Sequence, residues 1–173
     1  KGPGRAWTVK GAVTAVEGNL KGRNFASGEN LYHATACASC HRFAGEGMGI
    51  GPALTGSANR YTLRDIMENS SEPSKVISHP YIDSQFTKKD AYTVIGRIAE
   101  EKNGMLHLMT NPFSAESNVQ IKAADVKSKK PHEVSHMPPA LIYTLNPDEL
   151  SDLIAYIFSA GDKDHKYFSA EKK

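Results

Sequence analysis

The sequence has little cysteine: only Cys37 and Cys40 among its 173 residues are of this type. A structural zinc site needs further cysteines or paired histidines beside such a pair. A thioredoxin-like redox pair is expected to follow a strand of a βαβ unit. The scarcity and setting of the cysteines therefore disfavour the two common roles of a C-x-x-C pair.

The chain also lacks a long apolar run and a strong net charge. No segment approaches the roughly 20 apolar residues of a membrane-spanning helix. The hydrophobic content is 39% and the mean hydropathy is −0.46, which is typical of a soluble protein with a modest core. The formal net charge of +2 is too small to indicate nucleic-acid binding. The length fits one domain, with room for an insertion.

The histidine that follows the second cysteine indicates the role of the cysteine pair. Cys37, Cys40 and His41 form the pattern C-x-x-C-H, which is the attachment signature of a c-type haem. Two thiols at this spacing reach the two vinyl groups on one side of a porphyrin and form thioethers. The imidazole that follows binds the iron as its proximal ligand. The pattern therefore predicts one covalently bound haem c.

A Gly-Pro loop follows the motif and contains Gly51, Pro52 and Leu54. A ligating imidazole needs an acceptor for its second ring nitrogen, commonly a backbone carbonyl. We expect the Pro52 loop to supply that carbonyl and Leu54 to pack on the porphyrin face. Alone, the loop reads as an ordinary Gly-Pro turn. Beside C-x-x-C-H it makes the chain resemble the class I cytochrome c superfamily, whose haem pocket uses a Gly-Pro-x-Leu loop.

This resemblance implies a further cofactor contact. In the family, side chains that follow the loop and precede the next helix often hydrogen-bond a haem propionate. Arg60 stands at this point of the sequence and is a candidate for that role. The alternative interpretation is a solvated arginine.

Four helices are predicted from their caps and apolar spacing. The expected helices start after Thr8, Asn24, Thr62 and Asn146, and the first three run to about Glu17, Thr35 and Asn69. Gly161 is expected to end the fourth. Gly28 lies inside the second helix, which indicates a close helix crossing. The resemblance implies a crossing with the C-terminal helix at this glycine, near Tyr156.

Between the third and fourth helices the pattern alternates as in strands. Strands are expected at Ala91 to Ala99, at Met105 to Met109 and around Val119 and Ile121, with a hairpin turn at Asn103-Gly104. Three or four antiparallel strands follow from this pattern. Met105, His107 and Met109 share one face of a half-buried strand, which explains them more simply than metal binding. Lys127 to Lys130 is a basic run that we expect to be solvated.

The sixth iron ligand is predicted to be Met137. A thioether is a weak ligand, so its loop needs stiffening, and Pro138 and Pro139 follow directly. Met137 also precedes the C-terminal helix at the distance that cytochromes c use. His136 is the alternative because it is adjacent and binds iron more strongly. Met48 lies too near the proximal side.

The sequence as a whole resembles a narrower bacterial family, a haem-binding c domain with a β insertion before its Met-Pro loop. Such domains often lie at the C-terminal end of large secreted proteins with dehydrogenase-like modules. The stretches that carry this likeness are Trp7-Thr8, Gly22 to Phe25, Cys40 to Phe43, Gly51 to Gly56, Pro73 to Ser78 and Met137-Pro138.

The predicted fold class is mainly α, a class I cytochrome c fold with a small antiparallel β insertion. We expect a single cytochrome c domain over residues 1–173. Its parts are an N-terminal extension at 1–22, a haem-attachment half at 23–80, a β insertion at 81–131, the Met-ligand loop with the C-terminal helix at 132–161, and a loose charged tail at 162–173. Residues 1–5 are expected to be frayed or part of a linker.

The predicted function is electron transfer by one His/Met-ligated haem c, with no enzyme activity of its own. The resemblance implies a redox partner protein, either a periplasmic dehydrogenase or a fused domain. The alternative is a haem-based sensor of small ligands or a peroxidase-like haem enzyme in which Met137 is displaced. The insertion is expected to act primarily as a lid that shields the haem and steadies the Met137 loop, and the alternative role is a docking surface for a partner.

The expected location is the periplasm or another extracytoplasmic compartment, because haem is attached to C-x-x-C-H motifs outside the cytoplasm. The sequence opens at Lys1 with neither methionine nor an apolar signal region. We therefore expect either a cleaved export signal or a piece of a longer secreted protein.

Overall fold

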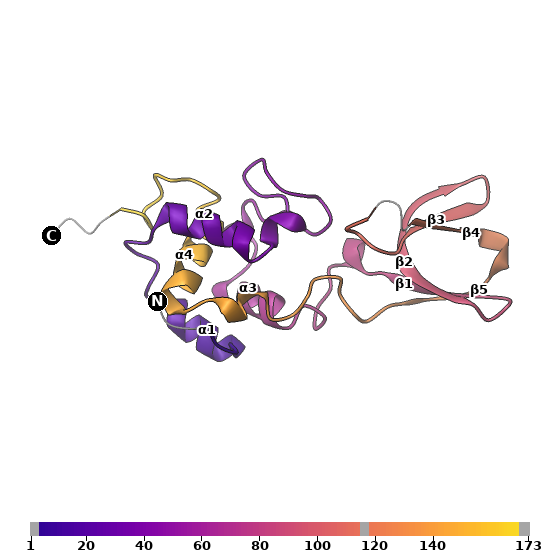
Figure 1. The fold of residues 1–173 in the computed structure, drawn as a ribbon, viewed down its shortest axis with the longest axis horizontal. Helices are drawn as coiled ribbons and strands as arrows, with labels where there is room; N and C mark the ends of the chain where they lie inside the picture. Colours follow the sequence, from indigo (N-terminus) through magenta and orange to yellow (C-terminus); the bar gives the residue numbers. More distant parts are fainter. Residues whose placement is uncertain (1–3, 115–117, 170–173) are drawn as a thin grey trace. The chain divides into compact units, whose positions relative to one another are not determined.

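The computed structural model describes residues 4–114 and 118–169. The chain forms two compact units. The first consists of Lys1–Lys75 and Met137–Lys173, and the second of Val76–His136. The first unit contains the α-helices and the second contains the sheet (Figure 1).

The helical unit contains four α-helices and three short 3₁₀ helices in the described part of the chain. The α-helices are α1 (Val9–Val16), α2 (Phe25–Ala34), α3 (Leu63–Ser71) and α4 (Pro147–Phe158), and the 3₁₀ helices are η1 (Cys37–Ser39), η2 (Ser57–Asn59) and η6 (Leu141–Thr144). Thr8, Asn24, Thr62 and Asn146 cap the four α-helices, which confirms the predicted starts.

Two of these caps are reciprocal. The Thr62 side chain accepts from the Asp65 N–H, and the Asp65 carboxylate accepts from the Thr62 N–H. Asn146 and Glu149 form the same arrangement at the start of α4. Each box satisfies backbone donors that a helix start leaves without partners. Local sequence therefore determines where α3 and α4 begin.

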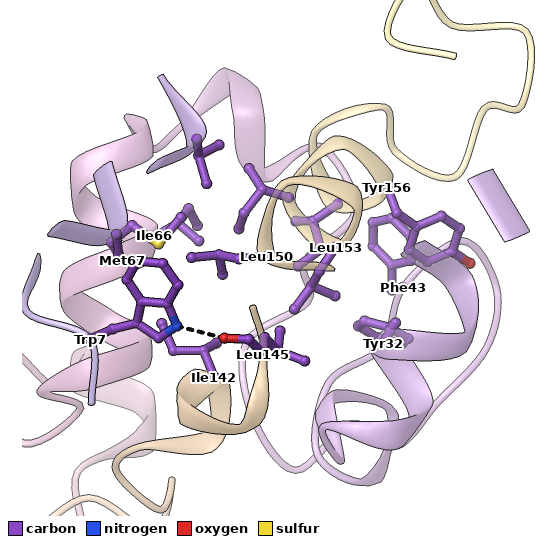
Figure 2. Close-up of a cluster of buried hydrophobic side chains, with 14 residues drawn as sticks. Trp7, Tyr32, Phe43, Ile66, Met67, Ile142, Leu145, Leu150, Leu153 and Tyr156 are labelled. Atoms are coloured by element: carbon purple, nitrogen blue, oxygen red, sulfur yellow. Dashed lines mark hydrogen bonds between the residues drawn. The ribbon is translucent and has the colours of Figure 1, made fainter. Parts of the chain in front are cut away.

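The core of this unit is a cluster of buried apolar side chains from all four helices and the segments between them. Figure 2 shows Trp7 at one end of the cluster and the rings of Tyr32, Phe43 and Tyr156 at the other. The Trp7 Nε1–H donates to the Leu145 carbonyl at 3.0 Å. The only tryptophan is therefore a packing anchor, because its ring is buried and its one polar atom has a partner.

Helices α2 and α4 approach closely at Gly28, as predicted. A Cβ added at Gly28 would lie 2.4 Å from the Asp152 carbonyl oxygen and 2.7 Å from the Tyr156 Cβ. No larger side chain fits between the two backbones at this distance. Gly28 therefore sets the separation of the two helices.

The segment after α4 contradicts the expected loose tail over its described part. The Arg23 N–H donates to the Tyr167 carbonyl at 2.8 Å, and the rings of Phe25 and Phe168 meet edge-on at 5.2 Å. Two aromatic residues thus fix this segment to the start of α2. The charged composition of this segment gave no indication of these two contacts. Residues 170–173 of the expected tail, and residues 1–3 of the expected frayed lead, lie outside the described residues.

The second unit is a five-stranded antiparallel sheet with strand order β4-β3-β2-β1-β5. The strands are β1 (Ser84–Lys88), β2 (Thr93–Lys102), β3 (Met105–Met109), β4 (Asn118–Lys122) and β5 (Val126–Pro131), with the short helices η3 (His79–Tyr81) and η5 (Ala123–Asp125) beside them. The expected turn joins β2 to β3, with φ of 52° at Asn103 and 74° at Gly104. Both residue types tolerate this left-handed backbone.

The sheet has more strands than the three or four predicted. The additional strands β1 and β5 are largely polar: β5 reads Val-Lys-Ser-Lys-Lys-Pro, and it is the edge strand beside β1. The expected solvated lysines are exposed, yet they lie on this strand. An edge strand needs no apolar alternation because most of its surface faces water, and edge lysines oppose pairing with other chains.

One face of the sheet carries its own small core. Its buried members are Phe86, Val94, Leu106, Leu108 and Ile121. On β3 these alternate with the half-buried Met105, His107 and Met109. The described chain thus combines four helices with a five-stranded sheet, so "mainly α" fits the helical unit and not the chain as a whole. No helix within residues 4–114 and 118–169 is long and apolar enough to cross a membrane.

We predict that Gly28→Ala lowers the free energy of unfolding by about 1–3 kcal/mol, because the added methyl group meets the α4 backbone. Chemical denaturation followed by the helical circular dichroism signal measures this change. Asn30→Ala, on an exposed position of the same helix, is the control and should change stability by less than about 0.5 kcal/mol. Equal effects of the two substitutions would contradict the close crossing.

Candidate functional site

The two cysteines lie on the tight turn that follows α2. Thr35 is the C-cap of α2, and Ala36 has a left-handed backbone with φ of 60°. Cys37 opens η1, and Cys40 follows its last residue. Both thiols are half-buried, and neither forms a disulfide. The turn therefore presents two unbridged thiols close to the helix end.

Burial raises the pKa of both thiols above the ordinary value. For Cys37 a contact with the Thr35 hydroxyl, 3.3 Å from Sγ, opposes this rise in pKa in part. A raised pKa keeps a cysteine protonated near neutral pH, and a protonated thiol is a poor metal ligand and a poor redox nucleophile. The environment therefore does not favour these cysteines as an activated redox pair.

His41 is buried, and its ring is fixed by the Gly-Pro loop. Its Nδ1 lies 2.6 Å from the Pro52 carbonyl oxygen. A carbonyl only accepts, so Nδ1 carries the proton and Nε2 presents its lone pair. Within the described residues Nε2 has no hydrogen-bond partner. Burial lowers the pKa of His41, although the Pro52 hydrogen bond opposes this. The imidazole is thus held neutral, as a metal ligand must be.

Further hydrogen bonds close the loop onto the motif. The Gly51 N–H donates to the Cys40 carbonyl at 2.8 Å, and the Leu54 N–H donates to the Arg42 carbonyl at 2.9 Å. The backbone of His41 is also held from the helix side, because the Tyr32 hydroxyl donates to its carbonyl at 2.8 Å. Burial raises the pKa of Tyr32, which keeps this hydroxyl protonated as a donor.

Two glycines leave space for His41. A Cβ at Gly51 would lie 2.9 Å from the imidazole Cε1, so the bare backbone packs against the ring. A Cβ at Gly47 would lie 2.2 Å from the His41 carbonyl oxygen, and Gly47 has a φ of 84°. Such a backbone favours glycine on conformational grounds as well. The loop therefore fits the histidine only with glycine at these positions.

The remaining predicted residues of this loop have different surroundings. Leu54 is half-buried and packs against the core of the helical unit. Arg60 is exposed, and its Nη2 donates to the Ala53 carbonyl at 2.7 Å. Its guanidinium also lies 5.6 Å from the centre of the Tyr61 ring. Arg60 thus fastens the loop to η2 rather than extending freely into solvent.

The candidates for a second ligand are separated by their surroundings. Met137 is half-buried in the segment between β5 and η6. His136 makes an ion-pair contact through Nε2 with the buried Asp83 of its own unit. Met48 is 56% exposed, and its N–H donates to the Ala38 carbonyl beside the motif. The hydrogen bonds described above join Cys40 and His41 to the Pro52 loop, and none of them involves Met137.

Sequence reasoning missed three residues of this site. Tyr32 appeared only as part of an apolar stripe, and nothing local marks its hydroxyl as a donor to His41. Gly47 and Gly51 carry a weak signal, because four glycines within seven residues indicate a constrained loop. Their contacts with His41 become visible only in three dimensions.

The donor set fits a covalently bound haem better than a bare metal ion. No group of three or more histidine, cysteine, aspartate or glutamate side chains that suits a metal ion exists within residues 4–114 and 118–169. One oriented imidazole with an open Nε2, beside two unbridged thiols, matches a macrocycle that supplies its own four equatorial nitrogen ligands.

We predict that Gly51→Ala displaces the His41 ring and lowers the free energy of unfolding by about 1–3 kcal/mol, because the methyl group occupies the space of the imidazole. Denaturation measures the stability, and the ring N–H signal of His41 in an NMR spectrum reports its bond to Pro52. Gly49→Ala is the matched control, since its Cβ would meet nothing closer than Arg42 Nη2 at 3.6 Å. An unchanged ring signal in Gly51→Ala would refute the close packing.

Comparison with known proteins agrees with this geometry. No curated protein matches the chain. The family model described as Cytochrome c matches residues 25–94. The match begins at the first residue of α2 and includes the C-x-x-C-H motif, the Pro52 loop and α3, whereas Met137 and α4 lie beyond it. The match covers 70 of the 173 residues, and the functions that it suggests are haem binding and electron transfer.

Proposed function

We propose that this chain is an extracytoplasmic electron carrier with one covalently bound haem c, ligated by His41 and Met137. The observation that carries the proposal is the buried His41, whose Nδ1 is held 2.6 Å from the Pro52 carbonyl directly after two unbridged thiols. With only two cysteines in the sequence, the chain has one attachment motif and therefore one covalent haem.

In this proposal Cys37 and Cys40 serve only for attachment. Each thiol would add across one vinyl group of the haem, with a carbon–sulfur bond formed and the thiol hydrogen passed to the other vinyl carbon. Both sulfurs end as thioethers without redox activity. The reaction needs reduced cysteines, and Cys37 and Cys40 form no disulfide in the structure.

His41 and its loop then hold the proximal position fixed. The haem iron supplies reversible one-electron exchange when bound. The Pro52 carbonyl orients the imidazole and increases its basicity through Nδ1. Gly51 packs against the ring, and Tyr32 anchors the backbone of the same residue. A ligand fixed from three sides changes position little between oxidation states, which suits fast electron transfer.

Met137 is proposed as the sixth ligand. The surroundings of His136 support this choice, because the Nε2 of His136 already contacts Asp83. A thioether is a soft, neutral ligand that favours reduced iron and hence a high potential. Pro138 and Pro139 restrict the backbone after Met137. Because of this restriction the loop gains little conformational entropy when the methionine leaves the iron, which helps to keep such a weak ligand bound.

Leu54 and Arg60 are proposed to contact the haem itself. Leu54 comes from the loop that holds His41 and supplies an apolar surface for one porphyrin face. Arg60 uses one of its five N–H donors on the Ala53 carbonyl, so further donors remain for a propionate. The positive charge of Arg60 would offset part of the propionate charge.

The proposed partner is a redox protein, either a periplasmic dehydrogenase or a domain fused to this one. An extracytoplasmic location is proposed because haem attachment to a C-x-x-C-H motif takes place there. A sensor or peroxidase-like enzyme needs an open iron position. Ready binding of carbon monoxide by the reduced, unsubstituted protein would favour that alternative.

The attachment makes a direct prediction. One haem per chain should remain with the denatured protein through acid-acetone extraction, and thiol titration should find no free cysteine, because both sulfurs are thioethers. Mass spectrometry and the visible spectrum measure both results. The double variant Cys37→Ser/Cys40→Ser should release its haem completely, whereas the control Ser39→Ala should not. Extractable haem in the unsubstituted chain would refute the proposal.

A further prediction concerns Met137. The oxidised protein should show the weak far-red charge-transfer band of sulfur–iron ligation. Met137→Ala should abolish the band and lower the potential by about 0.1 V or more, within the roughly 0.8 V over which axial ligands act. Met48→Ala and Met105→Ala should change neither. If the far-red band survives in Met137→Ala, another residue is the sixth ligand. If the unsubstituted protein lacks the far-red band, nitrogen ligation by His136 is favoured.

A further inference from the structure

Asp83 is a buried acidic residue just before β1, and its side chain contacts the side chain of His136. Asp83 is 3% exposed, and its Oδ2 makes an ion-pair contact with the His136 Nε2. Its second oxygen, Oδ1, has no hydrogen-bond partner among the described residues. A buried carboxylate is costly unless it is paired. The folded unit therefore strongly favours the position of His136 beside Asp83.

The same two segments are joined by backbone bonds. The β1–β5 ladder ends with Ser84 opposite Pro131. One further bond extends it, because the His132 N–H donates to the Asp83 carbonyl at 2.9 Å. Beyond His132 the chain leaves the sheet, and the His136 side chain then returns to the same aspartate. Asp83 therefore closes the segment 132–136 at both ends.

The segment that Asp83 holds is followed directly by Met137, so the contact also restrains the backbone that leads into Met137. On its C-terminal side Met137 is restricted by Pro138, which also disfavours helical backbone at the residue before it. On its N-terminal side no proline or strand is present after Pro131. Ordering residues 133–136 costs conformational entropy, and the contact between His136 and Asp83 restricts the C-terminal end of this stretch. His136 thus supplies the restraint that the prolines supply on the other side.

We propose that Asp83 and His136 are positioning residues that hold Met137 in place as the sixth ligand of the haem iron. The inference rests on the proposed function. It also gives the sheet unit a defined role: the unit fixes the start of the ligand loop through a buried acid. Because His136 Nε2 is held by Asp83, the same contact keeps this stronger ligand from replacing the methionine.

The test uses the full haem-loaded chain and imidazole as a competing ligand of the oxidised protein. His136→Leu and Asp83→Asn remove or weaken the contact. His136→Gln keeps an N–H donor at the end of the side chain and is the conservative rescue. His132→Leu makes the same substitution four residues earlier, where the backbone rather than the side chain contacts Asp83.

The first two variants should bind imidazole about tenfold more tightly, because the population without bound methionine rises by that factor. They should also lose most of the far-red band. His136→Gln and His132→Leu should resemble the unsubstituted protein. Hydrogen exchange of the backbone amides in β1 and β5 shows which variants keep these two strands paired. If His136→Leu disrupts the pairing, the result for Asp83→Asn decides whether the contact positions Met137.

An unchanged band and unchanged imidazole affinity in both loss variants would overturn the inference. Equal losses in His136→Gln and His136→Leu would do the same, since the retained donor would then be irrelevant. Failure of the proposed function gives a different result: the unsubstituted chain would carry no covalent haem, or Met137→Ala would leave the far-red band intact.

Discussion

The helical unit depends on the close approach of α2 and α4 at Gly28. With the Asp152 carbonyl 2.4 Å from the position of a missing Cβ, the two backbones lie almost in contact. This approach brings the Tyr32 and Phe43 rings against Tyr156, with ring centres 5.9 Å and 5.1 Å from it. The end of α2, and with it the C-x-x-C-H turn, is thereby fixed to the core.

The geometry of the site follows from that anchor. Tyr32, on the last turns of α2, both packs on Tyr156 and donates its hydroxyl hydrogen to the His41 carbonyl. His41 is held on its other side by the Pro52 carbonyl and the bare backbone of Gly51. A single side chain is thus positioned by a helix, a loop carbonyl and a glycine. Such a preorganised ligand is what a carrier needs if its geometry is to stay constant between oxidation states.

The sheet unit is stabilised differently, by a small apolar face and by polar edge strands. Its core has five buried members, and Phe86 is contributed by a strand that is otherwise polar. The exposed lysines of β5 oppose the pairing of this edge strand with other chains. The buried Asp83 directly precedes β1 and contacts the segment after β5 through His132 and His136. The unit is therefore closed at the point where the chain continues into the proposed ligand loop.

The sequence by itself determined the features that arise from neighbouring residues. The caps at Thr62 and Asn146, the hairpin at Asn103-Gly104 and the C-x-x-C-H motif act over a few positions, so their consequences are readable from the order of residues. The Pro52 carbonyl was also predictable, because the chemistry of a ligating histidine requires an acceptor and the loop offered one.

Only the tertiary structure decided the rest. The strands β1 and β5 have almost no apolar alternation, since pairing with neighbours, not burial of their side chains, places them in the sheet. The Tyr32 hydroxyl, the ring contact of Gly51 and the pairing of Asp83 with His136 depend on which segments meet after folding. Local patterns report the preferences of neighbouring residues, whereas such contacts are set by the packing of segments that are distant in the sequence.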